Sequence, residues 1–262
     1  KLKTVPRPSH ADLAALKRYN GYNDYRGGGH FSGRLTAPLV FAGALAKCIL
    51  KERNIYVGSH ILQIMDIRDE EFDYLNVNKE VFEKIKQNQI SVIKSDTAEK
   101  MIAKIQGAFK EKTSVGGIIE TAVTGMPCGI GSPDYSIESI ISKNFFKIPA
   151  VKGIEFGLGF DFADKYGHQV NDQLEYKDGK INYLSNNNGG ITGGISTSCP
   201  IIFKTIFKPT PSIAREQKSI DLENQENVKL EITGRHDPCV AVRAAVVTES
   251  VAALSICQAL GI

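Results

Sequence analysis

Two long runs of small and apolar residues constrain the fold of this chain more than any other feature. The first covers residues 37–50 and the second covers residues 244–262. Only twelve residues separate Arg34 from Lys47, which is too few to cross a bilayer, and the second run carries Glu249. We therefore expect both runs to form helices that are buried inside the protein, and we expect no membrane partner.

The rest of the chain mixes helices and strands without a regular alternation. Helical periodicity predicts three further helices, at residues 78–88, 95–112 and 136–146. Runs rich in β-branched and apolar residues predict four strands, at residues 54–64, 114–125, 150–160 and 200–207. Residues 161–190 are polar and irregular, and residues 217–234 favour a loop or a hairpin. The predicted fold class is α+β, and neither a phosphate-binding P-loop nor a dinucleotide fingerprint is present.

The composition excludes several function classes. The net charge of the 262 residues is only +3, so no global field favours nucleic acid, and basic residues must act locally. An RNA-binding role for the RGGG segment is disfavoured because the element occurs once and no platform of interleaved aromatic residues accompanies it beyond Phe31. The five cysteines are odd in number and lack CxxC spacing, which predicts a reduced, cytoplasmic protein without a metal site.

The segment DYRGGGHFSGRLT, residues 24–36, precedes the first apolar helix. Consecutive glycines let the backbone approach a ligand closely, and a helix N-terminus adds positive potential. The forked guanidinium donors of Arg26 and Arg34 match phosphate and carboxylate groups. The segment therefore favours an anion site; the alternative is a turn with solvated arginines.

An arginine spacing recurs near the other end of the chain. Arg26 and Arg34 are eight positions apart, as are Arg235 and Arg243, and a helix of small residues follows each pair. This repeated pattern predicts a core with pseudo-twofold internal symmetry; the alternative is that the shared spacing is a coincidence.

Three short motifs hold further candidate residues. In VPRPSHAD, His10 could move a proton near neutral pH, although most histidines do not. In RHDPC, Asp237 is either an ion-pair anchor or a base held in place. In FKPTPSI, Lys208, Thr210 and Ser212 are possible phosphate donors; the alternative is a proline-rich strand exit.

Together, six segments resemble the chorismate synthase family. They occur in the order typical of that family and span nearly the whole chain: RPSHAD, DYRGGGHFSGRLTA, AVKGIEFG, NNNGGITGGIS, KPTPSI and GRHDPCVAVRA. The resemblance implies a β-α-β sandwich-type single domain with pseudo-twofold symmetry over residues 1–262. It also implies a cytoplasmic homotetramer.

The resemblance implies a lyase. Members of this family convert 5-enolpyruvylshikimate 3-phosphate to chorismate and phosphate by anti-1,4-elimination, the last step of the shikimate pathway. They require reduced FMN although the reaction has no net redox change, and NADPH is involved only indirectly, through a reductase. A doubly carboxylated, phosphorylated substrate and a phosphorylated flavin match a site built from clustered basic residues.

The resemblance also implies residue roles. His10 corresponds to the histidine that protonates the reduced flavin, and Asp237 to the aspartate that deprotonates flavin N5. Arg7, Arg34 and Arg235 correspond to residues that hold the substrate anions. The implied flavin-binding residues are His30, Phe31, Ser32, Pro149, Ala150, Gly193, Lys208, Pro209, Thr210, Pro211, Ser212 and Arg235.

Two departures from the family pattern stand out. HFSGRLT replaces the common R-S-S-A-R-E-T, which leaves the roles of His30 and Phe31 open. The N-terminal G-E-S-H-G motif, whose histidine protonates the leaving phosphate, does not occur in this sequence. We therefore expect the N-terminal part of the family domain to be absent from this chain. Either that segment lies outside this sequence, or this polypeptide is not active alone. The alternative function is a non-catalytic flavin- or anion-binding module.

Overall fold

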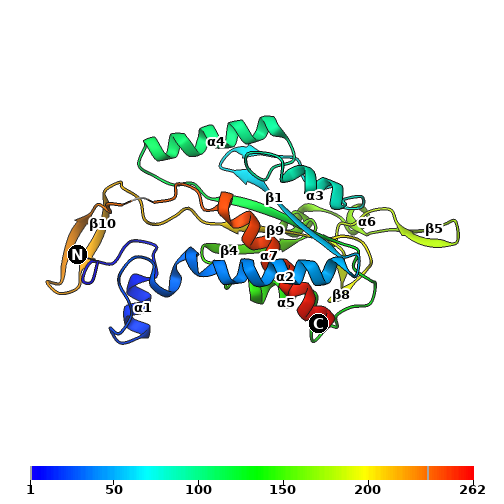
Figure 1. The fold of residues 1–262 in the computed structure, drawn as a ribbon, viewed down its shortest axis with the longest axis horizontal. Helices are drawn as coiled ribbons and strands as arrows, with labels where there is room; N and C mark the ends of the chain where they lie inside the picture. The colour runs from blue at the N-terminus through cyan, green and yellow to red at the C-terminus, as the bar shows by residue number, and fades with distance from the viewer. Residues whose placement is uncertain (1, 235) are drawn as a thin grey trace.

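A five-stranded antiparallel sheet forms the centre of the molecule (Figure 1). The computed structural model describes residues 2–234 and 236–262. The strand order is β2-β1-β3-β9-β4, with the bounds β1 (Tyr56–Ile64), β2 (Ile67–Arg68), β3 (Gly117–Thr124), β4 (Val151–Phe156) and β9 (Ile201–Phe207). Three two-stranded ribbons lie outside this sheet: β5 (Leu174–Lys177) with β6 (Lys180–Tyr183), β7 (Ile191–Thr192) with β8 (Ile195–Ser196), and β10 (Gln217–Asp221) with β11 (Glu226–Leu230).

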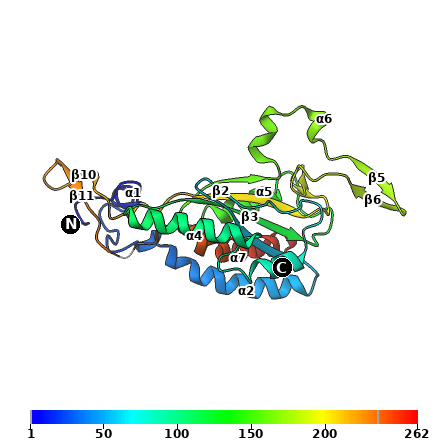
Figure 2. The ribbon, with the colours of Figure 1, turned by 90° about the horizontal axis from the view of Figure 1, so that it is seen from above.

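Helices cover the central sheet. The α-helices are α1 (Asp12–Arg18), α2 (Ala37–Lys51), α3 (Lys79–Ile85), α4 (Ser95–Lys110), α5 (Ile137–Phe145), α6 (Gly167–Val170) and α7 (Ala241–Leu260). Short 3₁₀ turns are η1 (Gly29–Phe31), η2 (Gly33–Thr36) and η3 (Gly159–Asp164). Helices α5 and α7 pack on one face of the sheet, and α2 lies against α7 (Figure 2). Helix α3 packs on the opposite face, where Phe82 lies directly over Gly58 of β1.

The central strands are buried on both faces, which explains their nearly continuous apolar sequences. Val57, Ile119 and Phe203 belong to the main core, which they share with the helices. On the other face, Ala122 and Ile202 pack with aromatic residues of α3 and the segment before it. The α+β class, the helices and the four main strands predicted from the sequence are therefore confirmed.

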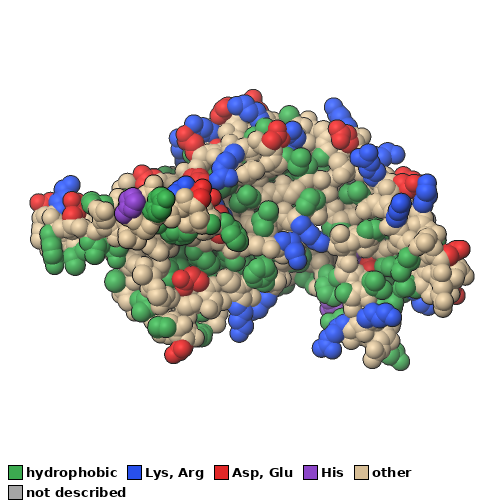
Figure 3. Space-filling view, turned by 180° about the vertical axis from the view of Figure 1, so that it is seen from behind, with side chains coloured by type: hydrophobic (Ala, Val, Ile, Leu, Met, Phe, Trp, Pro, Cys, Tyr) green, Lys and Arg blue, Asp and Glu red, His purple; other side chains and the backbone are tan. Residues whose placement is uncertain are grey.

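The segment 161–190, which was expected to be irregular, contains the β5–β6 ribbon, so that expectation was wrong. The directly paired residues Leu174 with Tyr183 and Tyr176 with Ile181 share one face of the ribbon. Polar residues lie between them in each strand. Figure 3 shows apolar side chains along one side of this projecting arm, at the left of the view. The polar composition of the flanking segments hid this short alternating pattern.

The expectation that both apolar helices are buried holds for α7 only. In α2 the buried residues are Gly43, Ala46 and Leu50, whereas Phe41 and Leu45 are exposed. The reason is that α2 contacts α7 along a single face. By length and composition alone, Gly33–Lys51 and α7 could each span a membrane, but most of α7 is buried, as in the core helix of a soluble protein.

Helices α2 and α7 run in the same direction and approach each other closely. A Cβ atom placed on Gly43 would lie 2.3 Å from Ser250 Cβ, so only glycine fits at this contact. Lys47 Nζ lies 2.6 Å from Oε1 of the buried Glu249, which joins the two helices by an ion pair. The two helices that follow the arginine pairs, α2 and α7, therefore pack directly against each other. The pseudo-twofold symmetry of the whole core stays a prediction.

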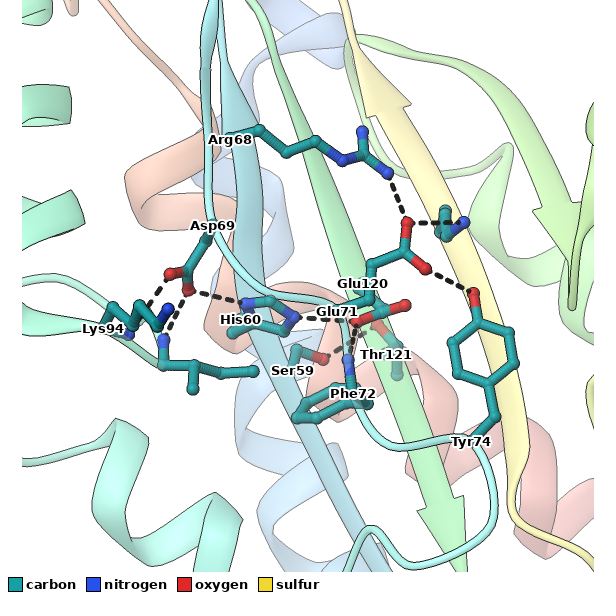
Figure 4. Close-up of polar contacts among 12 residues, drawn as sticks. Ser59, His60, Arg68, Asp69, Glu71, Phe72, Tyr74, Lys94, Glu120 and Thr121 are labelled. Atoms are coloured by element: carbon teal, nitrogen blue, oxygen red, sulfur yellow. Dashed lines mark hydrogen bonds and ion pairs between the residues drawn. The ribbon is translucent and has the colours of Figure 1, made fainter.

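A row of alternating charges crosses four neighbouring strands on the face opposite α7. His60, Glu120, Lys204 and Glu155 stand in direct register on β1, β3, β9 and β4, and Figure 4 shows His60 beside Glu120. His60 Nε2 lies 2.9 Å from Glu120 Oε2, and both side chains are fully buried. Lys204 Nζ lies 3.8 Å from Glu155 Oε1. Each buried charge therefore has an opposite charge on the next strand, which buried ions require.

The segment after β2 completes this charged row. His60 Nδ1 lies 3.3 Å from Asp69 Oδ2, and the N–H of Phe72 donates to Glu120 Oε2 at 2.7 Å. Burial alone would lower the pKa of His60, but hydrogen bonds to Asp69 and Glu120 outweigh it and raise that pKa. Burial likewise opposes ionisation of Asp69, yet hydrogen bonds from His60 and the Ile93 amide lower its pKa. The row is therefore held together by a cationic imidazole between two carboxylates.

Replacing His60 by glutamine should destabilise the protein in a pH-dependent manner. A histidine with a raised folded pKa stabilises fully below its unfolded pKa of about 6.5, and this stabilisation is lost as pH rises through the folded pKa. At pH 6 we expect a loss of about 3–5 kcal/mol, because two buried carboxylates lose their cationic partner. Urea unfolding at a series of pH values measures this loss. As the pH rises into the alkaline range, the difference in unfolding free energy between wild type and His60→Gln should decrease.

The control for this variant is His168→Gln, which changes an exposed histidine of α6. Its unfolding free energy should stay within about 0.5 kcal/mol of wild type at every pH. A His60→Gln loss that did not depend on pH would contradict a charged imidazole in the row.

Replacing Gly43 by alanine should destabilise the α2–α7 contact. The new methyl group would overlap Ser250 and force the helices apart, at about 1–3 kcal/mol. Gly107 in α4 is the matched control, because a Cβ there meets nothing within 4 Å. Gly107→Ala should stabilise by up to about 1 kcal/mol through helix propensity. Thermal unfolding measures both variants, and equal effects would rule out close packing at Gly43.

Candidate functional site

A cavity of about 1050 Å³ lies where helices α2 and α7 begin. Its wall comprises the loop before α1, the turns η1 and η2, the segment between α5 and β4, and the chain that leaves β9. Ligand pockets usually measure about 300–1,000 Å³, so this cavity has room for more than one small molecule. The segments that form it are far apart in sequence and meet only through the packing of the helices on the sheet.

The cavity is strongly cationic although the chain as a whole is not. Its described wall residues include one carboxylate, that of Asp237, and five cationic side chains, those of Arg7, Arg34, Lys147, Lys208 and Arg243. The N-terminal turns of α2 and α7 also line it, which adds the positive ends of two helix dipoles. The arrangement therefore favours ligands with several negative charges.

The loop before α1 holds Arg7 and His10 in place at the cavity wall. Arg7 Nε and Nη2 donate to the two oxygens of Asp12, at 2.7 and 2.8 Å, and Nη2 also donates to the Gly27 carbonyl at 2.7 Å. The Lys208 ammonium donates to the Ser9 carbonyl at 2.6 Å. The predicted substrate residue Arg7 is thus largely occupied in joining its own loop to the glycine-rich turns.

The glycine-rich turns bring Arg34 to the cavity. Ser32 caps η2 by accepting a hydrogen bond from the Arg34 backbone at 3.3 Å. Gly29 has a φ of +48°, and a Cβ there would lie 2.8 Å from the Asp24 carbonyl. Arg26 pairs with Asp24 at 2.9 Å, is largely exposed and is not part of the cavity wall. Of the two arginines in the predicted anion segment, the structure therefore places only Arg34 in the cavity.

The chain leaving β9 contributes hydroxyl groups. Thr210 and Ser212 line the cavity beside Lys208. The Thr210 hydroxyl is buried and has no hydrogen-bond partner among the described residues, and the Ser212 side chain is also buried. A buried hydroxyl without a partner is costly, so an acceptor in the cavity would satisfy it.

Asp237 forms an ion pair with an arginine of α7. Its Oδ2 lies 2.8 Å from Nε of Arg243, which belongs to the first turn of α7. The Cys239 amide donates to its Oδ1 at 3.3 Å. Burial, followed by the positive charge of Arg7, lowers the pKa of the neighbouring His236, which favours a neutral imidazole. The carboxylate therefore lies in a cationic environment at the cavity wall.

An apolar surface completes the cavity. Its described members include Val40, Phe146, Ile148, Phe207, Val240 and Val247. Pro149 and Ala150 lie within it, and Ala150 has a φ of 73°, which is unusual for a residue with a side chain. The Ala150 carbonyl accepts a hydrogen bond from the Lys208 amide at 2.9 Å, so β9 holds this conformation. An apolar surface beside donor groups suits a planar ring that carries an anionic tail.

Most of the predicted site residues meet in this cavity. Its wall contains Arg7, His10, His30, Phe31, Ser32, Arg34, Pro149, Ala150, Lys208, Thr210, Pro211, Ser212 and Asp237. Pro209 lies between two wall residues without being one itself. Gly193 lies in the turn between β7 and β8, away from the cavity, with a φ of +62°. Arg235 lies outside the described residues. The ligand-binding roles of all these residues stay predictions.

Four residues lie in or directly beside the site although no role for them is predicted from the sequence: Asp12, Phe146, His236 and Arg243. Asp12 ends the RPSHAD motif, and Arg243 belongs to the second arginine pair, so both had a signal in the sequence. Phe146 had none. Across the described residues, no group of three or more His, Cys, Asp and Glu side chains is arranged to hold a metal ion.

Comparisons with known proteins identify the family of this chain. The profile of a protein family described as "Chorismate synthase" matches residues 1–260. A chorismate synthase of Korarchaeum cryptofilum is 44% identical over 256 residues, which cover 97% of this chain and 70% of that protein. A chorismate synthase of Pyrococcus abyssi is also 44% identical, over 254 residues that cover 96% and 69% of the two chains.

A solved structure extends the similarity to the fold. A crystal structure of chorismate synthase superimposes with a TM-score of 0.78 at 27% sequence identity, covering 95% of this chain and 69% of that one. The family profile, the curated relatives and the fold all agree, and this chain therefore belongs to the chorismate synthase family.

Proposed function

We propose that this chain carries out the reaction of its family, the conversion of 5-enolpyruvylshikimate 3-phosphate to chorismate and phosphate. The observation that carries the proposal is the cationic cavity, which gathers sequence motifs from both ends of the chain. The excess of basic side chains over carboxylates in its wall suits ligands that carry carboxylates and phosphates, as the substrate and FMN do. The reaction breaks the carbon–oxygen bond to phosphate and the C–H bond at C6, and it leaves no net redox change.

The residues of the cavity fit a flavin mononucleotide. Lys208, the orphaned hydroxyl of Thr210 and the buried Ser212 supply donors for a phosphate. The apolar surface around Pro149 and Ala150 would lie against an isoalloxazine ring, as would His30, Phe31 and Ser32. When bound, reduced flavin would supply electron density for cleavage of the carbon–oxygen bond. The chain supplies the binding surface and the proton-carrying groups.

The protein's own residues then have separate tasks. Arg34 is accessible at the entry to α2, where it can bind two oxygens of one substrate anion. His10 and Asp237 both line the cavity, so each can hold or move a proton there, at its imidazole and its carboxylate respectively. Arg7 aligns the loop that carries His10.

The assembly and location follow from the same assignment. We infer that residues 1–262 act as one domain, because one hydrophobic core includes residues from Ala46 to Cys257. We also infer a cytoplasmic homotetramer that obtains reduced FMN through a separate reductase and NADPH. Light scattering of the purified protein tests the tetramer.

The decisive experiment is an anaerobic assay of the protein, expressed with any sequence that its gene encodes beyond these residues. Substrate and chemically reduced FMN are added, and chorismate is measured. Chorismate formation supports the proposal. Tight binding of FMN and substrate without product would instead identify a non-catalytic flavin- or anion-binding module.

Replacing Arg34 by lysine should weaken substrate binding. A lysine cannot hold two oxygens at once, and one charge-assisted hydrogen bond contributes about 1.5–3 kcal/mol. We expect the substrate KM to rise at least about tenfold, with much less effect on FMN affinity. Arg26→Lys, in the same loop but outside the cavity, should leave KM unchanged. Equal KM values for the two variants would assign Arg34 a structural role.

Replacing Asp237 by asparagine should slow turnover by about 10²–10⁴-fold, the range for a positioned acid or base. Asparagine keeps the shape of the side chain but cannot accept the proton, so binding of FMN and substrate should change little. Single-turnover kinetics on folded, ligand-bound protein measures the step. A loss below tenfold, together with lower stability, would mean that Asp237 only anchors Arg243.

A further inference from the structure

The carboxylate of Asp12 contacts two residues of the cavity wall, Arg7 and His10. It is the first residue of α1, and it is not part of the cavity wall itself. Its Oδ1 lies 2.6 Å from His10 Nδ1 and accepts from Arg7 Nη2 at 2.8 Å. Its Oδ2 accepts from Arg7 Nε at 2.7 Å and from the Arg7 backbone at 2.9 Å. The carboxylate thus contacts four nitrogen atoms, which fills its acceptor capacity.

The hydrogens of Arg7 determine which nitrogen of His10 carries a proton. Nη2 of Arg7 has two hydrogens, and both are used, one by Asp12 Oδ1 and one by the Gly27 carbonyl. The 3.2 Å contact between Arg7 Nη2 and His10 Nδ1 therefore has no hydrogen left to share. A bare Nδ1 lone pair at 2.6 Å from a carboxylate oxygen would be repelled by it. Nδ1 must accordingly carry a proton and donate it to Asp12.

The environment keeps Asp12 ionised for this task. Burial of Asp12 opposes its charge, but hydrogen bonds from Arg7 and His10 outweigh burial and hold the pKa of this carboxyl well below its usual range. The side chains of Arg7, His10 and Asp12 are 5%, 14% and 12% exposed, so water competes little for these contacts. A carboxylate that is always charged provides a permanent acceptor for Nδ1–H.

We propose that Asp12 is a positioning residue that holds His10 as the tautomer protonated at Nδ1, which leaves Nε2 as the nitrogen that gains and loses the catalytic proton. In neutral imidazole, the hydrogen bond at one nitrogen decides which nitrogen stays basic. The catalytic consequence rests on the function proposed above, whereas the tautomer itself does not. Asp12 therefore acts on the reaction through His10 and Arg7 rather than by contact with a ligand.

Asp12→Asn distinguishes this role from simple packing. Arg7 can only donate hydrogen bonds, so the amide oxygen of the asparagine should turn toward Arg7 and its NH₂ group toward His10. Nδ1 would then have to accept a hydrogen bond, and the proton would move to Nε2. Arg7→Lys is the matched control, because it breaks the same two-pronged ion pair but leaves a carboxylate facing Nδ1.

Imidazole ¹⁵N NMR tests the tautomer on protein without flavin or substrate, at alkaline pH, with His10→Gln used to assign the signal. We expect Nδ1–H in the wild type and in Arg7→Lys, and mostly Nε2–H in Asp12→Asn. We also expect the kcat of Asp12→Asn to fall about 10–100-fold, the range for loss of an orienting partner, with little change in KM. If Asp12→Asn does not fold, Asp12→Glu replaces it: its carboxylate is displaced, so the Nδ1–H signal should weaken.

Three results would overturn the proposal: wild-type His10 protonated at Nε2, a tautomer that Asp12→Asn leaves unchanged, or an Arg7→Lys tautomer that shifts as Asp12→Asn does. A kcat that stays near wild type in folded Asp12→Asn would also overturn the positioning role. The two proposals can fail separately. If the tautomers are as expected but the wild-type protein forms no chorismate, the assignment at His10 is supported and the proposed function is overturned.

Discussion

The close contact between α2 and α7 is the constraint on which the site depends. Because Gly43 has no side chain, α2 can approach α7 until its backbone meets Ser250. Both helices run in the same direction, so this contact also places their N-terminal turns together beside the end of β9. The cavity forms at that point, and the positive ends of both helices contribute to it.

Charges are arranged in opposite ways on the two sides of the sheet. On the side of α3, His60, Glu120, Lys204 and Glu155 alternate in sign across the strands, so each buried charge is neutralised within the protein. In the cavity, cationic groups outnumber the single described carboxylate of its wall. The first arrangement fixes strand register, because a one-residue slip would separate every pair. The second leaves positive charge at the cavity wall that can attract an anionic ligand.

The sequence by itself predicted the main helices and strands and most of the residues that line the cavity. Continuous apolar runs predicted the central strands, and helical periodicity predicted α3, α4 and α5, because these patterns reflect burial along a single element. The motifs RPSHAD and KPTPSI drew attention to His10 and Lys208, and the structure places both residues in the cavity wall. The strand patterns did not predict the β5–β6 ribbon, because its four apolar positions are set among polar residues.

Only the tertiary structure decided which partner each charged residue has. The carboxylate of Asp237 pairs with Arg243, because the first turn of α7 brings that side chain to the loop. Arg26 and Arg34 looked equivalent, yet a turn directs Arg26 to Asp24 and away from the cavity. His60 and Glu120 are 60 residues apart and meet only through strand pairing. Periodicity records which face of an element is buried, whereas these pairings depend on distances between elements, which no local pattern contains.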